Sequence, residues 1–252
     1  MRMVLLTALG VGGATVMGAV LGFVFKNISH KFSDMVLAFA AGVMLAAAVI
    51  GLILPSLEYG QGMWALPVTI AGIFVGAYCL NLMDKLVPHL HRLAGTEQES
   101  HGESAEKLNK VLLFVLAIAI HNLPEGIAAG VGFGTGNEAE AVTIALGIAL
   151  QNIPEGMVII APMLAAGMSQ RRTFAAAAAT GAVEVIGTIL GYCAVRISSA
   201  ILPFALAFAG GTMLYVISDE MIPETHHGDV DHVTYALLAG FCLMLAMTYY
   251  LE

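Results

Sequence analysis

Charged residues are scarce in this chain of 252 residues, where Asp, Glu, Lys and Arg together make up 11% of the sequence. Soluble domains carry about 25% charged residues, so a water-soluble globular protein is excluded. With 59% hydrophobic residues, the composition predicts an all-α polytopic membrane protein embedded in the lipid bilayer. One compact bundle over residues 1–252, a single transmembrane domain, is favoured over two domains.

Cysteine and basic residues are rare as well. Cys79, Cys193 and Cys242 are scattered through apolar runs without a CxxC pair. This pattern is typical of buried, inert thiols. The ten Lys and Arg residues form no basic patch, so nothing supports a nucleic-acid partner.

Long apolar stretches are abundant, and they predict eight membrane-spanning helices. The predicted spans cover about residues 3–25, 35–57, 59–83, 111–133, 141–168, 173–195, 197–218 and 232–251. The only charges inside them are Glu125, Glu155 and Glu184. The first run is too long for the apolar core of a signal peptide, roughly 7–15 residues, and is interpreted as a retained helix.

The basic residues are divided unevenly between the two sides that these spans define. One side collects Lys26, Lys31, Lys85, Arg92, Lys107, Lys110, Arg171 and Arg172, and the other collects Arg2 and Arg196. Cytoplasmic connections carry the excess of Lys and Arg. We therefore expect a cytoplasmic loop over residues 84–110 and both termini outside the cytoplasm.

Two near-copies of one motif lie inside the fourth and fifth spans. His121 to Gly126 reads HNLPEG, and Gln151 to Gly156, thirty residues later, reads QNIPEG. An ionised acid at the centre of a membrane helix costs about 2.5–3.5 kcal/mol. A bound cation is the obvious means of offsetting that cost in both copies.

Helix geometry places the motif side chains together. Residues four apart share a face, and at about 100° per residue Glu125 lies between the directions of His121 and Asn122. Pro124 lacks an N–H, so the carbonyl of Ile120 loses its helical donor, and a free carbonyl at membrane depth needs protein, water or a ligand to cover it. Two kinked helices whose acids reach the membrane surface are the simpler alternative, which the detailed repetition disfavours.

The ionisable groups deep in the spans are His121, Glu125, Glu155 and Glu184, with Asn122, Gln151 and Asn152 beside them. A mixed set of imidazole, carboxylate and amide groups suits Zn²⁺, Fe²⁺ or Mn²⁺ rather than K⁺. A site without thiolates suits transport, because the ion must leave again. Glu184 alone is also compatible with a structural acid paired with a hydroxyl; as a third acid in the membrane, it is more readily interpreted as a ligand.

Two polar segments lie at the predicted cytoplasmic side. Residues 84–110 contain His89, His91 and His101, and are interpreted either as a solvated linker or as a weak metal-capturing or sensing loop. The seventh span ends in a polar cluster for which we favour a metal staging site. The cluster comprises Asp219, Glu220, Glu224, His226, His227, Asp229, Asp231 and His232.

HNLPEG followed by QNIPEG resembles the paired metal-binding helices of the ZIP (Zrt/Irt-like protein) family, particularly its bacterial branch. The eight spans, the His-containing loop after span three and SDEMIPETHH at residues 218–227 are similar as well, so the resemblance covers nearly the whole chain. It implies uptake of zinc, or of iron, manganese or cadmium, across a bacterial plasma (inner) membrane. It also implies that spans one, four, five and six slide against the other four in alternating access.

The resemblance implies a binuclear site between spans four and five. One metal would be held by Met44, His121, Glu125, Gln151 and Glu155. The second would be held by Asn122, Glu125, Asn152, Glu155 and Glu184. Asp34, Asp219 and Glu220 match positions along entry and exit routes. Only the resemblance singles out Met44, and some relatives have His in place of Gln151 and an acid in place of Asn152.

Other functions remain open at this point. An intramembrane metallohydrolase needs a metal, a general base and an open coordination position, but the chain has no HExxH, so no enzyme is expected. A metal-gated channel or receptor is the other alternative. Three small-xxx-small patterns, beginning at Gly18, Gly72 and Gly187, suit close helix approach. They do not identify a dimer face, so a homodimer stays open.

Overall fold

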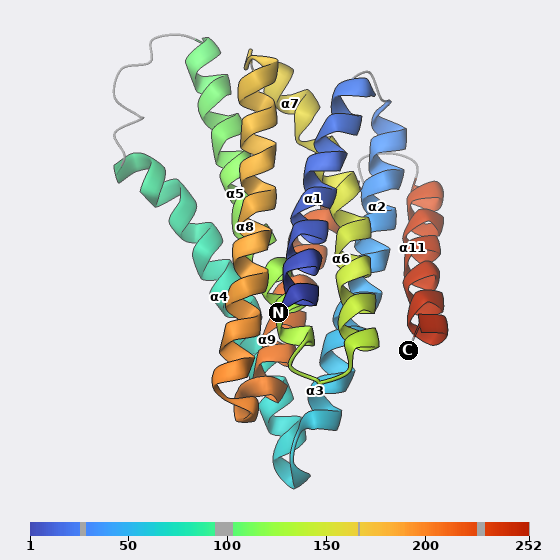
Figure 1. The fold of residues 1–252 in the computed structure, drawn as a ribbon. Helices are drawn as coiled ribbons and strands as arrows, with labels where there is room; N and C mark the ends of the chain where they lie inside the picture. The colour runs from blue at the N-terminus through green and yellow to red at the C-terminus, as the bar shows by residue number, and fades with distance from the viewer. Residues whose placement is uncertain (26–28, 94–102, 166, 226–229, 252) are drawn as a thin grey trace.

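The computed structural model describes residues 1–25, 29–93, 103–165, 167–225 and 230–251, and these ranges are helical and contain no strand (Figure 1). The all-helical membrane fold expected from the sequence is confirmed. The α-helices are α1 (Arg2–Val24), α2 (His30–Ala46), α3 (Leu54–Tyr59), α4 (Ala65–Leu93), α5 (Glu103–Gly132), α6 (Glu138–Val158), α7 (Ile160–Ala165), α8 (Gln170–Ile197), α9 (Leu202–Val216), α10 (Ile222–Thr225) and α11 (Val230–Leu251).

Seven helical stretches among the described residues are long and apolar enough to cross a membrane. They are Arg2–Val24, His30–Tyr59, Gly62–Lys85, Glu138–Ala165, Gln170–Ile197, Ser199–Thr225 and Asp231–Leu251. Helix α5, which carries the fourth expected span, is a further helix of 30 residues and packs along α8. The chain therefore crosses the bundle repeatedly, as the apolar runs predict.

Two helices extend into the segment that the sequence predicts as a loop. Helix α4 continues to Leu93 and α5 already begins at Glu103, so both cover part of residues 84–110. The segment is rich in Leu, Glu, Lys and Ala, which have high helix propensity. Polar residues end a membrane span but do not end a helix. The positions of charged residues alone therefore misplace the end of α4 and the start of α5. His101 lies outside the described residues.

Within the described residues, two π-helical turns interrupt otherwise α-helical spans. They are Ala47–Ile53, between α2 and α3, and Ile217–Met221, between α9 and α10. At the end of the second, the N–H of Ile222 donates to the carbonyl of Ile217, five residues back. π-helical turns are rare and are frequently found at functional sites, and no residue pattern in the sequence predicts them here.

Glycines allow the helices to pack backbone against backbone within two groups. The first helix group consists of α1, α5, α6 and α8. A Cβ on Gly18 of α1 would lie 2.1 Å from the carbonyl oxygen of Ile153 on α6, and one on Gly187 of α8 would lie 2.5 Å from that of Leu123 on α5. Substitution of these glycines would force the helices apart.

The second helix group consists of α2, α4, α9 and α11 and is packed in the same way. A Cβ on Gly42 of α2 would lie 1.9 Å from the carbonyl oxygen of Leu237 on α11, and one on Gly76 of α4 would lie 2.2 Å from that of Phe208 on α9. The small-xxx-small patterns of the sequence therefore mediate close contacts between helices of the same chain.

The boundary between the two groups is built from side chains. At this boundary a Cβ on Gly147 of α6 would meet the sulfur of Met244 on α11, and one on Gly51 would meet the side chain of Ile144 on α6. Methionine and isoleucine side chains can adjust by rotation, whereas a backbone carbonyl in a helix cannot. The contacts between the groups are therefore more deformable than the contacts within them.

Candidate metal site

The two motif helices extend through their prolines and carry the polar side chains into the bundle. Helix α6 begins at the cap residue Asn137, whose side chain accepts from the N–H groups of Ala139 and Glu140, and it continues past Pro154 to Val158. Helix α5 likewise continues past Pro124 to Gly132. Both motifs therefore remain helical, as their i, i+4 spacing requires.

Most of the predicted ligands are withdrawn from solvent. Glu125 and Asn122 on α5 are 1% exposed, His121 is 4% exposed, and Glu184 on α8 is fully buried. The predicted ligands Met44, Gln151 and Asn152 are also fully buried, and Glu155 is partly buried. An apolar bundle thus encloses three carboxylates and an imidazole, an arrangement that needs compensating partners.

Glu184 has such partners. Its Oε1 accepts hydrogen bonds from the hydroxyl of Thr15, at 2.6 Å, and from Nδ2 of Asn122. Its Oε2 accepts from Nδ2 of Asn152 at 2.7 Å. Three helices, α1, α5 and α6, therefore contribute donors to one carboxylate on α8.

Glu125 and the amides of the two motifs contain buried polar atoms that lack such partners. Both carboxylate oxygens of Glu125 have no hydrogen-bond partner among the described residues, and the same holds for Oδ1 of Asn122 and of Asn152 and for both side-chain polar atoms of Gln151. Buried oxygens without donors are costly. Carboxylate and amide oxygens can together bind one hard or borderline divalent cation. The unpartnered atoms around Glu125 therefore suit a metal ion.

His121 joins the site to the second helix group. Its Nε2 lies 3.1 Å from Oδ1 of Asp84 on α4 and 3.0 Å from Oε1 of Glu220 in the second π-helical turn. One ring nitrogen carries at most one proton and cannot fully satisfy two carboxylates. Because one ligand atom from each residue lies within 4.8 Å of the others, the three can hold a metal ion.

Asp84 is a site residue that the sequence analysis missed. The apolar runs place it at the start of a cytoplasmic loop, whereas it lies within α4. Its position directly after the third apolar run was the available signal, because an acid there lies at the same membrane boundary as the acids of the seventh span.

A cavity of about 530 Å³ connects the buried ligands to one end of the bundle. Its buried end is lined by His121, Asn122 and Glu125, with Glu155 beside them, and its other end is lined by acids of the seventh span. Those acids are Asp219, Glu220 and Glu224, and Asp219 and Glu224 are exposed. The described lining contains no Lys or Arg, so the path is suited to a cation.

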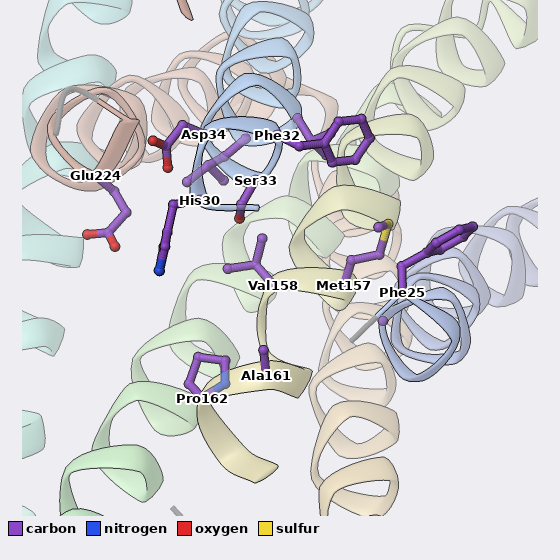
Figure 2. A pocket seen from close by; sticks show the side chains of 13 residues that line it. Phe25, His30, Phe32, Ser33, Asp34, Met157, Val158, Ala161, Pro162 and Glu224 are labelled. Carbon is purple, nitrogen blue, oxygen red and sulfur yellow. The ribbon is translucent and has the colours of Figure 1, made fainter. Parts of the chain in front are cut away.

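A smaller cavity of about 250 Å³ adjoins the first, and both are lined by Leu37, Val158 and Glu224. Figure 2 shows the side chains of His30, Asp34 and Glu224 gathered on one side of it, with Met157 and Phe25 on the other. Asp34, predicted along a metal route, therefore lies beside the mouth of the larger cavity.

Other predicted residues lie away from the cavity. Its described lining does not include Met44, Gln151, Asn152 or Glu184. Met44 belongs to the hydrophobic core. His226 and His227 lie outside the described residues. Four of the predicted ligands thus line the cavity, namely His121, Asn122, Glu125 and Glu155, and the described lining leaves out the others.

Comparison with known proteins adds independent information. A family model described as ZIP Zinc transporter matches residues 91–248, which include both motifs. The match covers more than half of the chain and includes α5, α6, α8 and the segment from α9 to α10. These helices carry the cavity lining except Leu37, and three of the four residues of the Glu184 network.

Three relatives match over nearly all of this chain. Zinc transporter GufA from Myxococcus xanthus is 40% identical over 250 residues, covering 96% of each chain. Zinc transporter ZIPB from Bordetella bronchiseptica is 38% identical over 92% of this chain and 76% of its own length. Zinc transporter ZupT from Chlorobaculum parvum is 34% identical over 94% of this chain and 92% of its own.

Proposed function

Since the chain belongs to the ZIP zinc transporter family, we propose that it carries zinc through the buried polar site between α5 and α6. It is an integral membrane protein and a divalent metal uptake transporter. The observation that carries the proposed route is the cavity that leads from the exposed acids Asp219 and Glu224 to the buried His121 and Glu125. Iron, manganese and cadmium are further candidate substrates.

The transported metal occupies a binuclear site in this proposal. The first position uses Met44, His121, Glu125, Gln151 and Glu155, and the second uses Asn122, Glu125, Asn152, Glu155 and Glu184. The unpartnered buried oxygens of Glu125, Asn122 and Asn152 support it, because a cation can satisfy all of them together. Glu125 and Glu155 bridge the two metals, while Glu184 serves the second alone.

His121 passes the ion from the site to the exit. It lines the buried end of the cavity and also contacts Asp84 and Glu220, so the same imidazole can serve two successive coordination sets. An ion that exchanges its ligands one at a time always keeps some protein ligands in place of the water it has lost. Glu220, Asp219 and Glu224 then form the staging site proposed for the cytoplasmic mouth, with Asp34 beside it.

Alternating access follows from movement of the first helix group against the second. The division of glycine contacts supports it, since backbone contacts hold each group together and side chains meet between them. At the end of the bundle away from the cavity, the hydroxyl of Tyr59 donates to Oε2 of Glu140 at 3.3 Å and joins the groups. In this proposal the Tyr59–Glu140 contact belongs to the closed side of the transporter, and the cavity belongs to its open side.

In this proposal the protein lies in the plasma (inner) membrane of a bacterium, and the cavity opens to the cytoplasm. Every proposed ligand comes from one chain, so assembly into a homodimer would leave the site unchanged. The division of Lys and Arg supports a cytoplasmic segment 84–110 and external termini. Cysteines placed at Ser100 and at Glu252 should then react with an impermeant reagent from opposite sides. Reaction from the same side would contradict the orientation.

Zinc uptake into proteoliposomes, measured beside bound metal by mass spectrometry, tests the site. Glu125→Ala should abolish uptake and remove both metals, whereas Glu184→Gln should retain about one metal. Glu138→Ala, which removes an exposed carboxylate at the start of α6, is the matched control and should transport normally. If Glu125→Ala still binds two metals, the bridged site is wrong.

The same uptake assay separates the alternatives. Saturable uptake with turnover far below channel rates indicates a transporter, and channel-like flux would favour a metal-gated channel or receptor. The relatives are named as zinc transporters and not as enzymes. Proteolysis of a membrane substrate that is lost on His121→Ala would be needed to support an intramembrane metallohydrolase.

A further inference from the structure

Helix α1 reaches the buried site through one side chain, that of Thr15. Its hydroxyl donates to Oε1 of Glu184 at 2.6 Å, and Thr15 is 1% exposed. None of the predicted metal ligands lies on α1. Thr15 and Glu184 are 169 residues apart in sequence, so only the fold brings them together.

Close helix packing holds Thr15 in place. A Cβ on Gly156 of α6 would lie 2.2 Å from the carbonyl oxygen of Thr15, and one on Gly181 of α8 would lie 3.5 Å from its Cβ. One turn earlier on α1, the carbonyl of Val11 accepts from Nδ2 of Asn152. Thr15 therefore lies where α1 packs against both α6 and α8.

The hydrogen bonds to Glu184 fix the orientation of the side-chain amides of Asn122 and Asn152. An ionised carboxylate only accepts hydrogen bonds and offers about four lone-pair positions. Glu184 receives Thr15, Asn122 and Asn152 as donors, which leaves one position. Because each asparagine turns Nδ2 toward Glu184, each Oδ1 points elsewhere, and both Oδ1 atoms are without partners.

We propose that Thr15 is a positioning residue for metal transport: it holds Glu184 so that the amide oxygens of Asn122 and Asn152 face the transported cation. The inference rests on the proposed metal site. Thr15 does not bind the metal; it acts through Glu184. Loss of a partner that orients a ligand lowers metal affinity or activity by about 10–100-fold, and this is the effect expected when the hydroxyl is removed.

Three variants separate the effect of the Thr15 hydroxyl from the effect of side-chain packing. Thr15→Val keeps the shape and removes the hydroxyl, and Thr15→Ser keeps the hydroxyl. Thr180→Val is the matched control, because Thr180 is equally buried but donates to the carbonyl of Ala177 on its own helix. For zinc uptake, we expect Thr15→Val to raise KM about tenfold or more, with Thr15→Ser and Thr180→Val close to the unmodified protein.

A double-variant cycle tests whether Thr15 acts through Glu184. In a Glu184→Gln background, Thr15→Val should add little further loss, because residues in one hydrogen-bond network are not additive. If the losses of uptake caused by Thr15→Val and by Glu184→Gln multiply in the double variant, the proposal is overturned. Normal uptake by Thr15→Val while Glu125→Ala remains inactive would also overturn it. Normal uptake by Glu125→Ala would instead refute the proposed metal site, so the two failures are distinguishable.

Discussion

Replacement of Gly126 by alanine should damage the site without removing any polar group. Gly126 follows Glu125 on α5, and a Cβ there would lie 2.3 Å from the carbonyl oxygen of Glu184 on α8. Ordinary contact begins at 3.4 Å, so the shortfall is 3.4 − 2.3 = 1.1 Å. The obstacle is backbone in a helix, and rotation of a side chain cannot relieve it. The two helices must therefore separate at the level of the metal site.

The expected magnitude follows from that shift. Overpacking costs about 1–3 kcal/mol, and alanine recovers up to about 1 kcal/mol of helix propensity, so the net loss reaches about 2 kcal/mol. For a protein of this size the melting temperature should fall by up to about 8 °C. A shift of roughly 1 Å also exceeds the ~0.2 Å tolerance of metal–ligand distances, so zinc affinity should fall by about tenfold or more.

Thermal unfolding in detergent and zinc uptake in proteoliposomes measure the two effects. Gly10→Ala is the control, because Gly10 is also on a helix of the first group and a Cβ there meets nothing within 4 Å. It should be neutral or slightly stabilising. If Gly126→Ala proves as stable and as active as Gly10→Ala, the close approach of α5 and α8 does not maintain the site.

Three other perturbations have expected outcomes. Acid should weaken zinc binding between about pH 7.5 and 5.5, because the metal must displace protons from His121 and the carboxylates; a flat affinity measured by equilibrium dialysis would count against His121 as a ligand. Asp84→Asn should lower the maximal uptake rate more than zinc binding, since Asp84 acts at the exit, and unchanged kinetics would remove it from the route. Replacement of His89, His91 and His101 by Ser should leave substantial uptake; complete loss in a normally inserted protein would place them in the obligatory path.

The parts of the fold that the sequence predicted depend on local composition. A helix in lipid must satisfy its own backbone hydrogen bonds, so long apolar runs have few alternatives, and the all-helical membrane fold followed. The repeated motif identified His121, Asn122 and Glu125 for the same reason, because i, i+4 spacing within one helix is fixed. These three residues line the buried end of the cavity.

Contacts between distant helices were not predictable from local composition. The sequence favours Glu184 as a ligand over a hydroxyl-paired acid, and only the packing of α1 against α8 brings the hydroxyl of Thr15 to it. The approach of Asp84 to His121 likewise depends on how α4 and α5 pack. Neither pair has a sequence signal, since any buried hydroxyl or boundary acid has the same local pattern.

The π-helical turn Ile217–Met221 keeps residues on both sides of it on one wall of the cavity. Such a turn holds one residue more than an α-helical turn, and Asp219 and Glu220 lie within it. Val216 and Glu224 both line the cavity, although a separation of eight positions in an ordinary α-helix places two side chains about 80° apart around the axis. The extra residue of the π-helical turn takes up about 100° of rotation, so the two side chains return to within about 20° of one face. Conversion of this segment to an ordinary α-helix of the same length would turn Glu224 away from Val216, although every acidic side chain would still be present.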